Sequence, residues 1–459
     1  MRSAAIVSMM CVTGLALGLA NSLSYASDID TNPNPNTEWD NQWPASESDY
    51  FSDYTQLTFE SKFIKAGESY FSPNGRMIIF QAIELPEDGQ EADPHYSMYV
   101  STVKRDDNGL ITGLGKAGRV SKPGSANTCG WFHPIDPMKI LFGTTNTPPR
   151  SEDVAGFQRE DSKYSWQFPI EMEVYSGDLH MTFALSDEAE TRAKAMALED
   201  KTKTPELTEN DIVSVPAVKN LKPVWERNGY DAEGSWSPDG RFILYTQLEP
   251  GDDNGDLWIY DTTNSSHTPL ITEDGYDGGP FFSPDGKSIC YRSDRHNDNL
   301  LQIFVADLVF DESGAVTGAN EKQITENEHV NWCPFFTPDG KYLLYATSEQ
   351  SHGNYEIYAI DATGNSPMDE TPRMRITNAR GFDGLPAFTA DGEWMIWTAQ
   401  RGEIRDGEDR PSSQLWSAKI DLDAIDKAYQ AERAAMIAKK ASQSAKDDME
   451  DFENYTPAD

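Results

Sequence analysis

Carboxylate and amide side chains recur at matched positions along this sequence, and they are the residues best suited to chemistry. Each lies shortly before a turn written Ser-Pro-Asp-Gly or a variant of it, as in GYDAEGSWSPDG (229–240) and GYDGGPFFSPDG (275–286). Counting five residues back from the aromatic residue before each turn gives the first set: Ala66, Asn127, Asp231, Asp277, Asn331 and Asp383. Two residues further along lies the second set: Glu68, Cys129, Glu233, Gly279, Cys333 and Leu385.

Oxygen atoms that converge from separate segments suit a hard cation such as calcium, and they suit hydrogen bonds to a sugar or a basic peptide end. His329, two residues before Asn331 in ENEHVNWC, can join them. The alternative is structural, because Asp or Asn at a strand start often bonds to local backbone amides. Our candidate ligand-binding residues are Asn127, Asp231, Glu233, Asp277, His329, Asn331 and Asp383, with no metal assigned.

Sequence motifs of catalysis are missing. There is no Gly-x-Ser-x-Gly elbow, glycine-rich phosphate loop or CxxC pair, and no two of the 7 histidines have the i, i+4 spacing of a helical zinc site. The recurring aromatic residues are better explained by strand packing than as platforms for sugars. We assign no catalytic residue and identify no cofactor, although paired carboxylates can act as acid and base.

The turns belong to six similar hairpins, in which an aromatic residue, a turn and an alternating apolar run follow one another. Pro presets φ in the turn and Gly supplies positive φ. The copies are YFSPNGRMIIF (70–80), WFHPIDPMKILF (131–142), SWSPDGRFILY (235–245), FFSPDGKSICY (281–291), FFTPDGKYLLY (335–345) and AFTADGEWMIW (387–397). A third and a fourth strand follow, as in DLWIYDTT and PLIT. Gly240, Gly286, Gly340 and Gly392 are 46, 54 and 52 residues apart, which is typical of propeller blades. We predict an all-β, six-bladed β-propeller over residues 54–422, with both residue sets around the mouth of a central funnel.

The ends of the repeat predict how the ring closes. The sixth unit lacks a fourth strand, whereas YTQLTF (54–59) precedes the first unit and matches that strand. We therefore expect the N-terminal strand to complete the last blade, which leaves few exposed strand edges. A helical insertion is predicted at about 186–220, with either FALS or VKNL as the neighbouring fourth strand, and a helical to disordered acidic tail at 423–459.

The Ser-Pro-Asp-Gly hairpins and the trailing Ile-Thr strands resemble the TolB-like β-propeller family over residues 54–422. This resemblance implies the fold and leaves the function open, since relatives serve as envelope scaffolds, as gates of prolyl-oligopeptidase-like proteases and as the body of some polyuronate lyases. The lyase-type propellers use several histidines around a metal. No comparable histidine cluster accompanies the two residue sets.

Residues 1–26 read as a secretory signal, with Arg2, an apolar run and the exit Ser24-Tyr25-Ala26, followed by an extended segment at 27–53. We expect cleavage, no integral membrane segment afterwards and a periplasmic or secreted protein. The net charge of -38 argues against nucleic acid as a partner. An odd number of cysteines remains after cleavage: Cys129, Cys290 and Cys333.

We expect a binding scaffold for an envelope protein, peptide or glycan, more than an enzyme. The alternative is a polysaccharide lyase or hydrolase that uses Asp231, Glu233, Asp277 and Asp383, with or without a divalent cation. A third possibility is an assembly role for the acidic surface and the tail.

Overall fold

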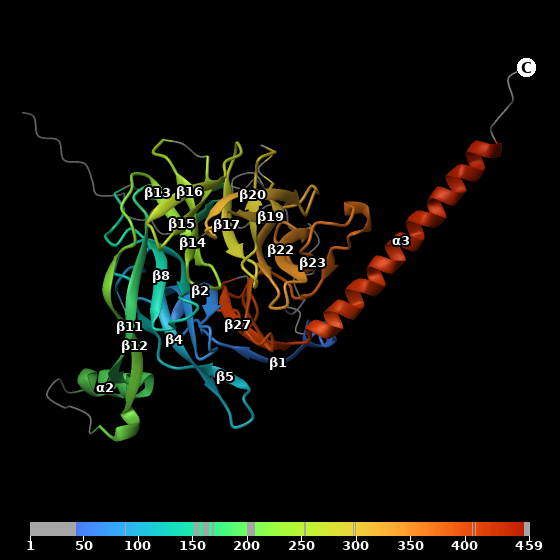
Figure 1. Ribbon diagram of the computed structural model, residues 1–459. Helices are drawn as coiled ribbons and strands as arrows, with labels where there is room; N and C mark the ends of the chain where they lie inside the picture. Colours follow the sequence, from blue (N-terminus) through green and yellow to red (C-terminus); the bar gives the residue numbers. More distant parts are fainter. Residues whose placement is uncertain are drawn as a thin grey trace, which may run out of the picture.

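The protein is a ring of six antiparallel sheets around a central axis (Figure 1). The computed structural model describes residues 43–453 except 88, 151–155, 159–164, 168, 200–206, 252–253, 297, 299, 406 and 409. The expected signal at 1–26 and most of the segment at 27–53 lie outside the described residues. The six-bladed propeller predicted from the repeats is confirmed.

The blades follow one another along the chain, each with its first strand nearest the axis. Blade 1 contains β2 (Phe63–Phe71), β3 (Met77–Glu84), β4 (Ser97–Arg105), β5 (Ile111–Leu114) and β6 (Gly118–Arg119). Blade 2 contains β7 (Asn127–Phe132), β8 (Lys139–Thr144), β11 (Glu173–Leu185) and β12 (Ile212–Pro223). Blade 3 contains β13 (Tyr230–Trp236), β14 (Phe242–Leu248), β15 (Asp256–Asp261) and β16 (Ser266–Ile271).

The second half of the ring is more regular. Blade 4 contains β17 (Asp277–Phe282), β18 (Ser288–Ser293), β19 (Gln302–Phe310) and β20 (Val316–Gln323). Blade 5 contains β21 (Asn331–Phe336), β22 (Tyr342–Ser351), β23 (Asn354–Asp361) and β24 (Met374–Arg375). Blade 6 contains β25 (Asp383–Phe388), β26 (Trp394–Ala399), β27 (Gln414–Ile420) and β1 (Phe51–Gln56). Short elements outside the blades are α1 (Trp43–Ser46), β9 (Gly156–Gln158), β10 (Ser165–Gln167), η1 (Glu209–Asp211) and η2 (Met368–Glu370).

The N-terminal strand closes the ring as predicted. Strand β1 pairs antiparallel with β27, with Phe51 opposite Ile420 and Gln56 opposite Trp416. Just beyond it, the Leu57 N–H donates to the Leu415 carbonyl at 2.8 Å. The strand begins three residues before the YTQLTF phrase, because Phe51 also packs into the apolar core of blades 5 and 6.

The apolar core lies between neighbouring blades. The residues of the alternating run after each turn are fully buried there, and they include Ile79, Ile243, Ile289, Leu343 and Ile396. Because each sheet buries one face against the blade before it and the other against the blade after it, the second strands are apolar on both faces. The repeated apolar run is therefore the packing element of the ring.

One insertion, between the third and fourth strands of blade 2, extends beyond the blades. Strands β11 and β12 continue past the last pairing with β8, and helix α2 (Asp187–Glu199) follows β11. Lys116 ties this helix to blade 1 through Asp187 at 3.2 Å and Glu190 at 2.5 Å. The inserted helix is thus confirmed, and the VKNL phrase lies in β12, which makes it the fourth strand of blade 2.

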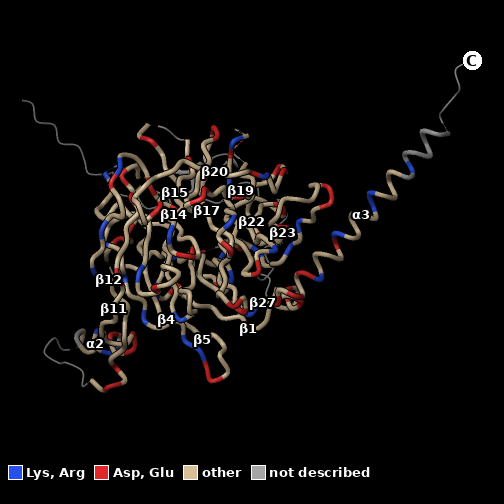
Figure 2. Tube along the Cα trace, in the orientation of Figure 1, with Lys and Arg blue, Asp and Glu red and all other residues tan. Residues whose placement is uncertain are grey.

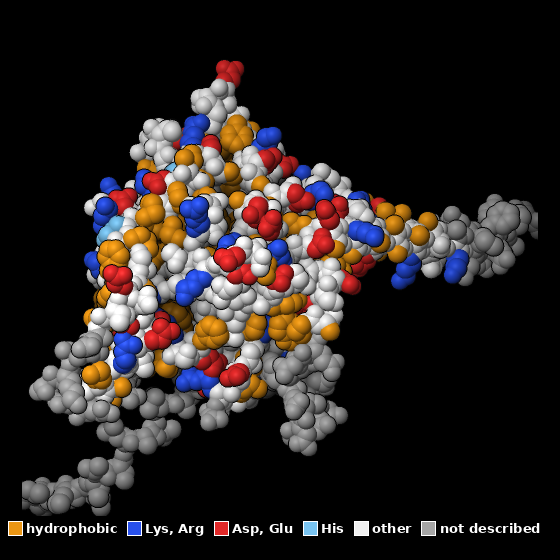
Figure 3. All heavy atoms as spheres, turned by 90° about the horizontal axis from the view of Figure 1, so that it is seen from below, with side chains coloured by type: hydrophobic (Ala, Val, Ile, Leu, Met, Phe, Trp, Pro, Cys, Tyr) orange, Lys and Arg blue, Asp and Glu red, His pale blue; other side chains and the backbone are white. Residues whose placement is uncertain are grey.

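Helix α3 (Leu422–Glu453) is the long C-terminal element. Ile425 and Tyr429 bury its first turns against blades 5 and 6, and Lys440 reaches Glu370 at 2.9 Å. Its later turns extend away from the ring (Figures 1 and 3). Among the described helices, none combines the length and the apolar character that a membrane span requires.

Candidate functional site

The second-set residues form a layer around the axis because each inner strand has a bulge there. The pairing register slips at this point in all six blades. All six residues have positive φ, between 42° and 59°: Glu68, Cys129, Glu233, Gly279, Cys333 and Leu385. Such a backbone is costly for residues other than glycine, and a bulge redirects side chains out of the regular alternation. This strained backbone conformation is present in all six blades, and it places the second-set residues around the axis.

Neighbouring blades meet through this layer. The Gly279 N–H donates to the Glu233 carboxylate, and the Leu385 N–H donates to Cys333 Sγ at 3.0 Å. Glu68 and Cys129 also share a hydrogen bond, and burial raises the pKa of both side chains. The second set is therefore a chain of contacts from blade to blade rather than an open circle of ligands.

Glu233 is the centre of a charged cluster on this layer. Its carboxylate accepts hydrogen bonds from the Tyr276 hydroxyl at 2.6 Å and from Thr246 Oγ1 at 3.2 Å. The Arg292 guanidinium lies 3.5 Å from the Glu233 carboxylate. It also lies over the Trp332 ring, 5.8 Å from the ring centroid. The layer thus has an arginine of its own opposite its acids, which lowers its need for an added cation.

Arg292 reaches the axis because blade 4 has glycine at the second-set position. A Cβ on Gly279 would lie 1.8 Å from Arg292 Nη1. The other five blades carry a side chain on the same backbone conformation, so glycine is needed here for space more than for φ. Sequence reasoning missed Arg292 because it lies in a second strand, outside both sets.

Gly279→Ala is therefore expected to lower the free energy of unfolding by about 1–3 kcal/mol, because the methyl group displaces the Arg292 guanidinium from Glu233. Gly318→Ala is the matched control, since no atom lies within 4 Å of its Cβ position. Urea denaturation of both variants measures the difference. Equal midpoints for the two variants would contradict this account.

Aromatic rings fill the axis below the charged layer. Tyr70 and Trp131 lie 4.5 Å apart between ring centroids, and Phe281 and Phe335 lie 5.0 Å apart. The two pairs touch across the ring, with Tyr70 5.6 Å from Phe281 and Trp131 6.1 Å from Phe335. These residues come from blades 1, 2, 4 and 5, so opposing blades meet at the centre. We call these four rings the aromatic plug.

The first-set residues lie at the joints between blades. In four of the six blades, the backbone N–H of the first-set residue donates to the carbonyl just before the third strand of the preceding blade. The pairs are Ala66 to Ser413 (2.9 Å), Asp231 to Met172 (2.9 Å), Asp277 to Gly255 (2.8 Å) and Asn331 to Leu301 (2.9 Å). This repeated bond gives the first-set position the same structural role in these four blades.

The side chains of the first set also have partners at these joints. Asn127 donates to the Tyr96 and Ser125 carbonyls, both at 2.7 Å, and Asn331 donates to Gln302 Oε1 at 3.0 Å. Asp231 accepts from Trp225 Nε1 at 2.7 Å, and Asp277 pairs with Arg295 at 3.0 Å. Of the seven candidate residues, only Glu233 joins the charged cluster on the axis.

His329 lies beside Asn331 without entering that cluster. Its N–H donates to Asn327 Oδ1 at 3.0 Å, and its carbonyl accepts from Asn331 Nδ2 at 3.2 Å. In the described part of the chain, no three His, Cys, Asp or Glu side chains gather as metal ligands would. All three cysteines retained after residue 26 are free: Cys129, Cys290 and Cys333.

Burial brings several first-set carboxyl groups toward neutral pKa values. It raises the pKa of Asp277 to about 7, although Arg295 opposes the shift, and the pKa of Asp231 to about 6. Glu173 at the start of β11, which sequence reasoning missed, shares the joint with Asp231. Burial raises its pKa to about 7, and the Asp231 charge adds to the shift. Glu173 Oε1 accepts from the Arg227 N–H at 3.2 Å.

The raised pKa of Asp277 predicts an unusual pH dependence of stability. The folded state binds this proton more tightly than the unfolded state, whose aspartate titrates near its ordinary value. The stabilisation is therefore complete below about pH 4 and is lost as the pH rises to about 7. Between these pH values, the free energy of unfolding of Asp277→Asn is expected to fall by about 1–3 kcal/mol less than that of the wild type.

Urea unfolding between pH 4 and pH 8 measures that difference. Asp107→Asn, on an exposed hairpin tip, is expected to keep the wild-type profile. A wild-type profile in Asp277→Asn would show that the group titrates normally in the folded protein.

Asp383 belongs to a fully buried ion cluster with the N-terminal segment. Arg401 Nε donates to Asp383 at 2.9 Å, and its two terminal nitrogens donate to Glu47 at 2.8 Å and 2.7 Å. The Trp43 ring covers the guanidinium at 4.3 Å. Arg401 is 1% exposed and Glu47 is 0% exposed. Sequence reasoning missed Arg401 and Glu47 because they lie outside the six repeated hairpins.

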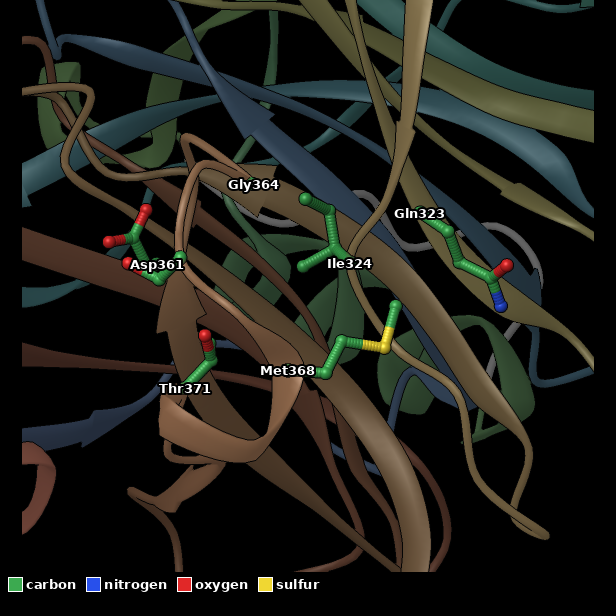
Figure 4. A pocket seen from close by; sticks show the side chains of 7 residues that line it. Gln323, Ile324, Asp361, Gly364, Met368 and Thr371 are labelled. Atoms are coloured by element: carbon green, nitrogen blue, oxygen red, sulfur yellow. The ribbon is translucent and has the colours of Figure 1, made fainter. Parts of the chain in front are cut away.

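Two cavities lie away from the axis. One of about 10 Å³ lies beside blade 5, where Ile324 and Met368 face the same space (Figure 4). This volume has room for about one water molecule. The other is a groove of about 520 Å³ between the turns of blades 4 and 5, on the face opposite the funnel mouth.

No protein-family model matches the chain. Among solved structures, TolB from Acinetobacter baumannii is 15% identical with a TM-score of 0.42, over 76% of this chain and 64% of that one. The chain therefore spans less than two thirds of that TolB. Oligogalacturonate lyase from Vibrio parahaemolyticus is 12% identical with a TM-score of 0.37, over 81% and 96% of the two chains.

A third similar structure is hydrazine synthase from Kuenenia stuttgartiensis, at 11% identity and a TM-score of 0.37, over 75% of this chain and 94% of that one. The six-bladed β-propeller of this chain is similar in structure to TolB and to oligogalacturonate lyase at low identity. At these identities the likeness concerns the fold alone.

Proposed function

We propose that this protein is an exported binding scaffold that holds a protein, peptide or glycan partner in the cell envelope. The observation that carries the proposal is the filled axis. The aromatic plug and the Glu233–Arg292 cluster occupy the centre with the side chains of this chain itself. A partner then engages the faces and the rim of the ring, where helix α3 and the β11–β12 extension project.

Crosslinking from native envelopes tests this proposal, with the protein lacking residues 1–26 as bait. We expect one reproducible partner that survives stringent washing and is purified for a binding measurement. A variant ending at residue 440 tests the contribution of the projecting part of α3. Absence of any partner, together with turnover on a panel of polymers and peptides that depends on Glu233, would overturn the scaffold in favour of an enzyme.

A second candidate function is a polysaccharide lyase or hydrolase, and one observation favours it. Asp231 and Glu173 share one joint, and both have pKa values raised into the range where a carboxyl group exchanges protons at neutral pH. Incubation with acidic and neutral polysaccharides tests it, with Asp231→Asn and Glu173→Gln expected to abolish any turnover. Turnover that persists in both variants would exclude this pair as acid and base.

A further inference from the structure

The groove between blades 4 and 5 is bordered by the Ser-Pro-Asp-Gly turn of blade 4 and the Thr-Pro-Asp-Gly turn of blade 5. Its apolar lining includes Pro284, Phe336 and Pro338, and its carboxylates are Asp285, Asp307 and Asp339. The volume of about 520 Å³ lies within the range of sites that hold small ligands or large side chains. A site of this kind combines an apolar floor with acidic walls.

Neighbouring gaps between turns on this face are covered by segments of the chain itself. Between blades 3 and 4, Arg241 Nη1 donates to the Gly314 carbonyl in the β19–β20 connection at 2.8 Å. Between blades 6 and 1, the Arg105 guanidinium from the β4–β5 hairpin lies 5.4 Å from the Trp394 ring centroid. Between blades 5 and 6, Leu422 at the start of α3 lies 3.3 Å from the Cβ position of Gly392.

The connection beside the groove between blades 4 and 5 is residues 362–373, between β23 and β24, and it does not form a lengthened hairpin like those of blades 1 and 4. Thr363 and Asn365 follow β23 there and line the groove without filling it. This gap is therefore a place on the turn face where a segment from another molecule has room to take the position that the chain's own segments take in the three gaps described above.

The charges of the groove favour a cation. Lys322 is its basic residue, and it is held by Asp307 at 2.9 Å and by the Thr363 carbonyl at 3.2 Å. Asp285 and Asp339 have side chains that are 61% and 39% exposed, and their nearest lysines are 3.8 Å and 3.5 Å away. Burial alone would raise the pKa of Asp285. Hydrogen bonds from Ser283 and from the Lys287 N–H outweigh this effect and keep the pKa below its usual value. The Asp285 carboxylate therefore stays ionised at neutral pH.

The gap between blades 3 and 4 shows how such a place is filled. Arg241 pairs there with Asp261 at 2.7 Å, and its guanidinium lies 4.7 Å from the Phe242 ring centroid. The filled gap thus combines an arginine with a carboxylate, an aromatic ring and a backbone carbonyl. Asp285, Asp339 and Phe336 offer carboxylates and an aromatic ring between blades 4 and 5, where the Thr363 carbonyl already accepts from Lys322.

We propose that this groove binds an arginine or lysine side chain presented by an extended segment of a partner protein. The inference rests on the proposed binding function and names the chemistry and the place of the contact. The partner is basic at the contact, as expected for a protein of net charge -38. A guanidinium is expected to bind more tightly here than an ammonium, because it can form two parallel hydrogen bonds to one carboxylate.

Fluorescence polarisation with labelled octapeptides tests the proposal on the full chain without residues 1–26. The probes contain two arginines, two lysines or two glutamines at the same positions. The Asp285→Asn, Asp339→Asn double variant is expected to bind the basic peptides at least tenfold more weakly than wild type. Asp107→Asn, which removes a charge far from the groove, is the matched control and is expected to bind as wild type does.

Several outcomes would overturn the proposal. They are equal binding of the glutamine peptide, equal loss in Asp107→Asn, and unchanged binding in the double variant. A photocrosslinking arginine peptide gives a second readout and is expected to label residues 283–288 or 336–340. Labelling elsewhere alone would also overturn it.

The failure of this inference and the failure of the scaffold are distinguishable. If native envelopes yield a partner that the double variant retains at full strength, the groove is not the contact and the scaffold stands. If the groove binds basic peptides but no envelope partner is captured, the scaffold fails and the groove remains a cation site.

Discussion

Replacing Arg401 with Met is expected to lower the free energy of unfolding at pH 7 by about 3–5 kcal/mol. The variant leaves Glu47 and Asp383 buried beside one another without the guanidinium that bonds to both. It also removes the cation that the Trp43 ring covers, so residues 43–47 lose their anchor on blade 6. Chemical denaturation gives the change in free energy directly.

Arg405→Met is the matched control, because it removes an arginine from the same connection. Its side chain is 43% exposed and lies 3.7 Å from Glu60, so we expect a loss of no more than about 1 kcal/mol. Lowering the pH to 5 should restore part of the stability of Arg401→Met, because protonation removes the repulsion between the two carboxylates. A deficit equal to that of Arg405→Met at pH 7 would contradict the ion cluster.

Phe335→Ala is expected to lower the free energy of unfolding by about 3 kcal/mol, at the lower end for a phenylalanine truncation because the ring is only partly buried. The ring touches Tyr70, Trp131 and Phe281, and it also packs on Phe388 at 6.2 Å. The cavity would therefore open where residues of five blades meet.

Phe183→Ala provides the comparison, since Phe183 is 80% exposed on the β11–β12 extension. We expect a change within about 0.5 kcal/mol there. Thermal and urea unfolding of both variants measure the contrast. If Phe335→Ala were as mild as Phe183→Ala, the four rings would not act as a plug.

The sequence predicted the parts of this structure that repeat locally. A turn with Pro and Gly, an aromatic residue before it and an apolar run after it are encoded within a dozen residues, so the six hairpins and the ring closure could be predicted. The second set was also found by its spacing. Its position near the axis follows from the blade geometry that the repeat implies.

The contents of the centre could not be predicted in the same way. Residues of the types of Glu68, Cys129 and Leu385 rarely adopt positive φ, so the sequence at these positions did not indicate the bulges. Arg292 depends on the missing side chain of Gly279, and Glu47 meets Arg401 only after the whole ring has closed. These contacts join residues far apart in the chain, and single-sequence patterns carry no record of such pairs.

Acidic and basic side chains are interspersed over the ring, with Asp106 and Asp107 at the tip of the hairpin that leads to β5 (Figure 2). The net charge therefore does not form one acidic face. A basic partner is therefore expected to recognise a local site, such as the groove between blades 4 and 5, rather than the electrostatic field of the whole protein.

The pairing of β1 with β27 also sets the order in which the molecule can be completed. A chain made from its N-terminus has to keep Phe51–Gln56 unpaired until Gln414–Ile420 has been synthesised, and the Glu47–Arg401 contact waits equally long. Contacts between such distant segments slow folding and leave a strand edge open to other chains in the meantime. Closure of the ring therefore requires residues 51–56 and 414–420 to meet, and any nascent or truncated chain that lacks residues 414–420 retains an unfinished sixth blade.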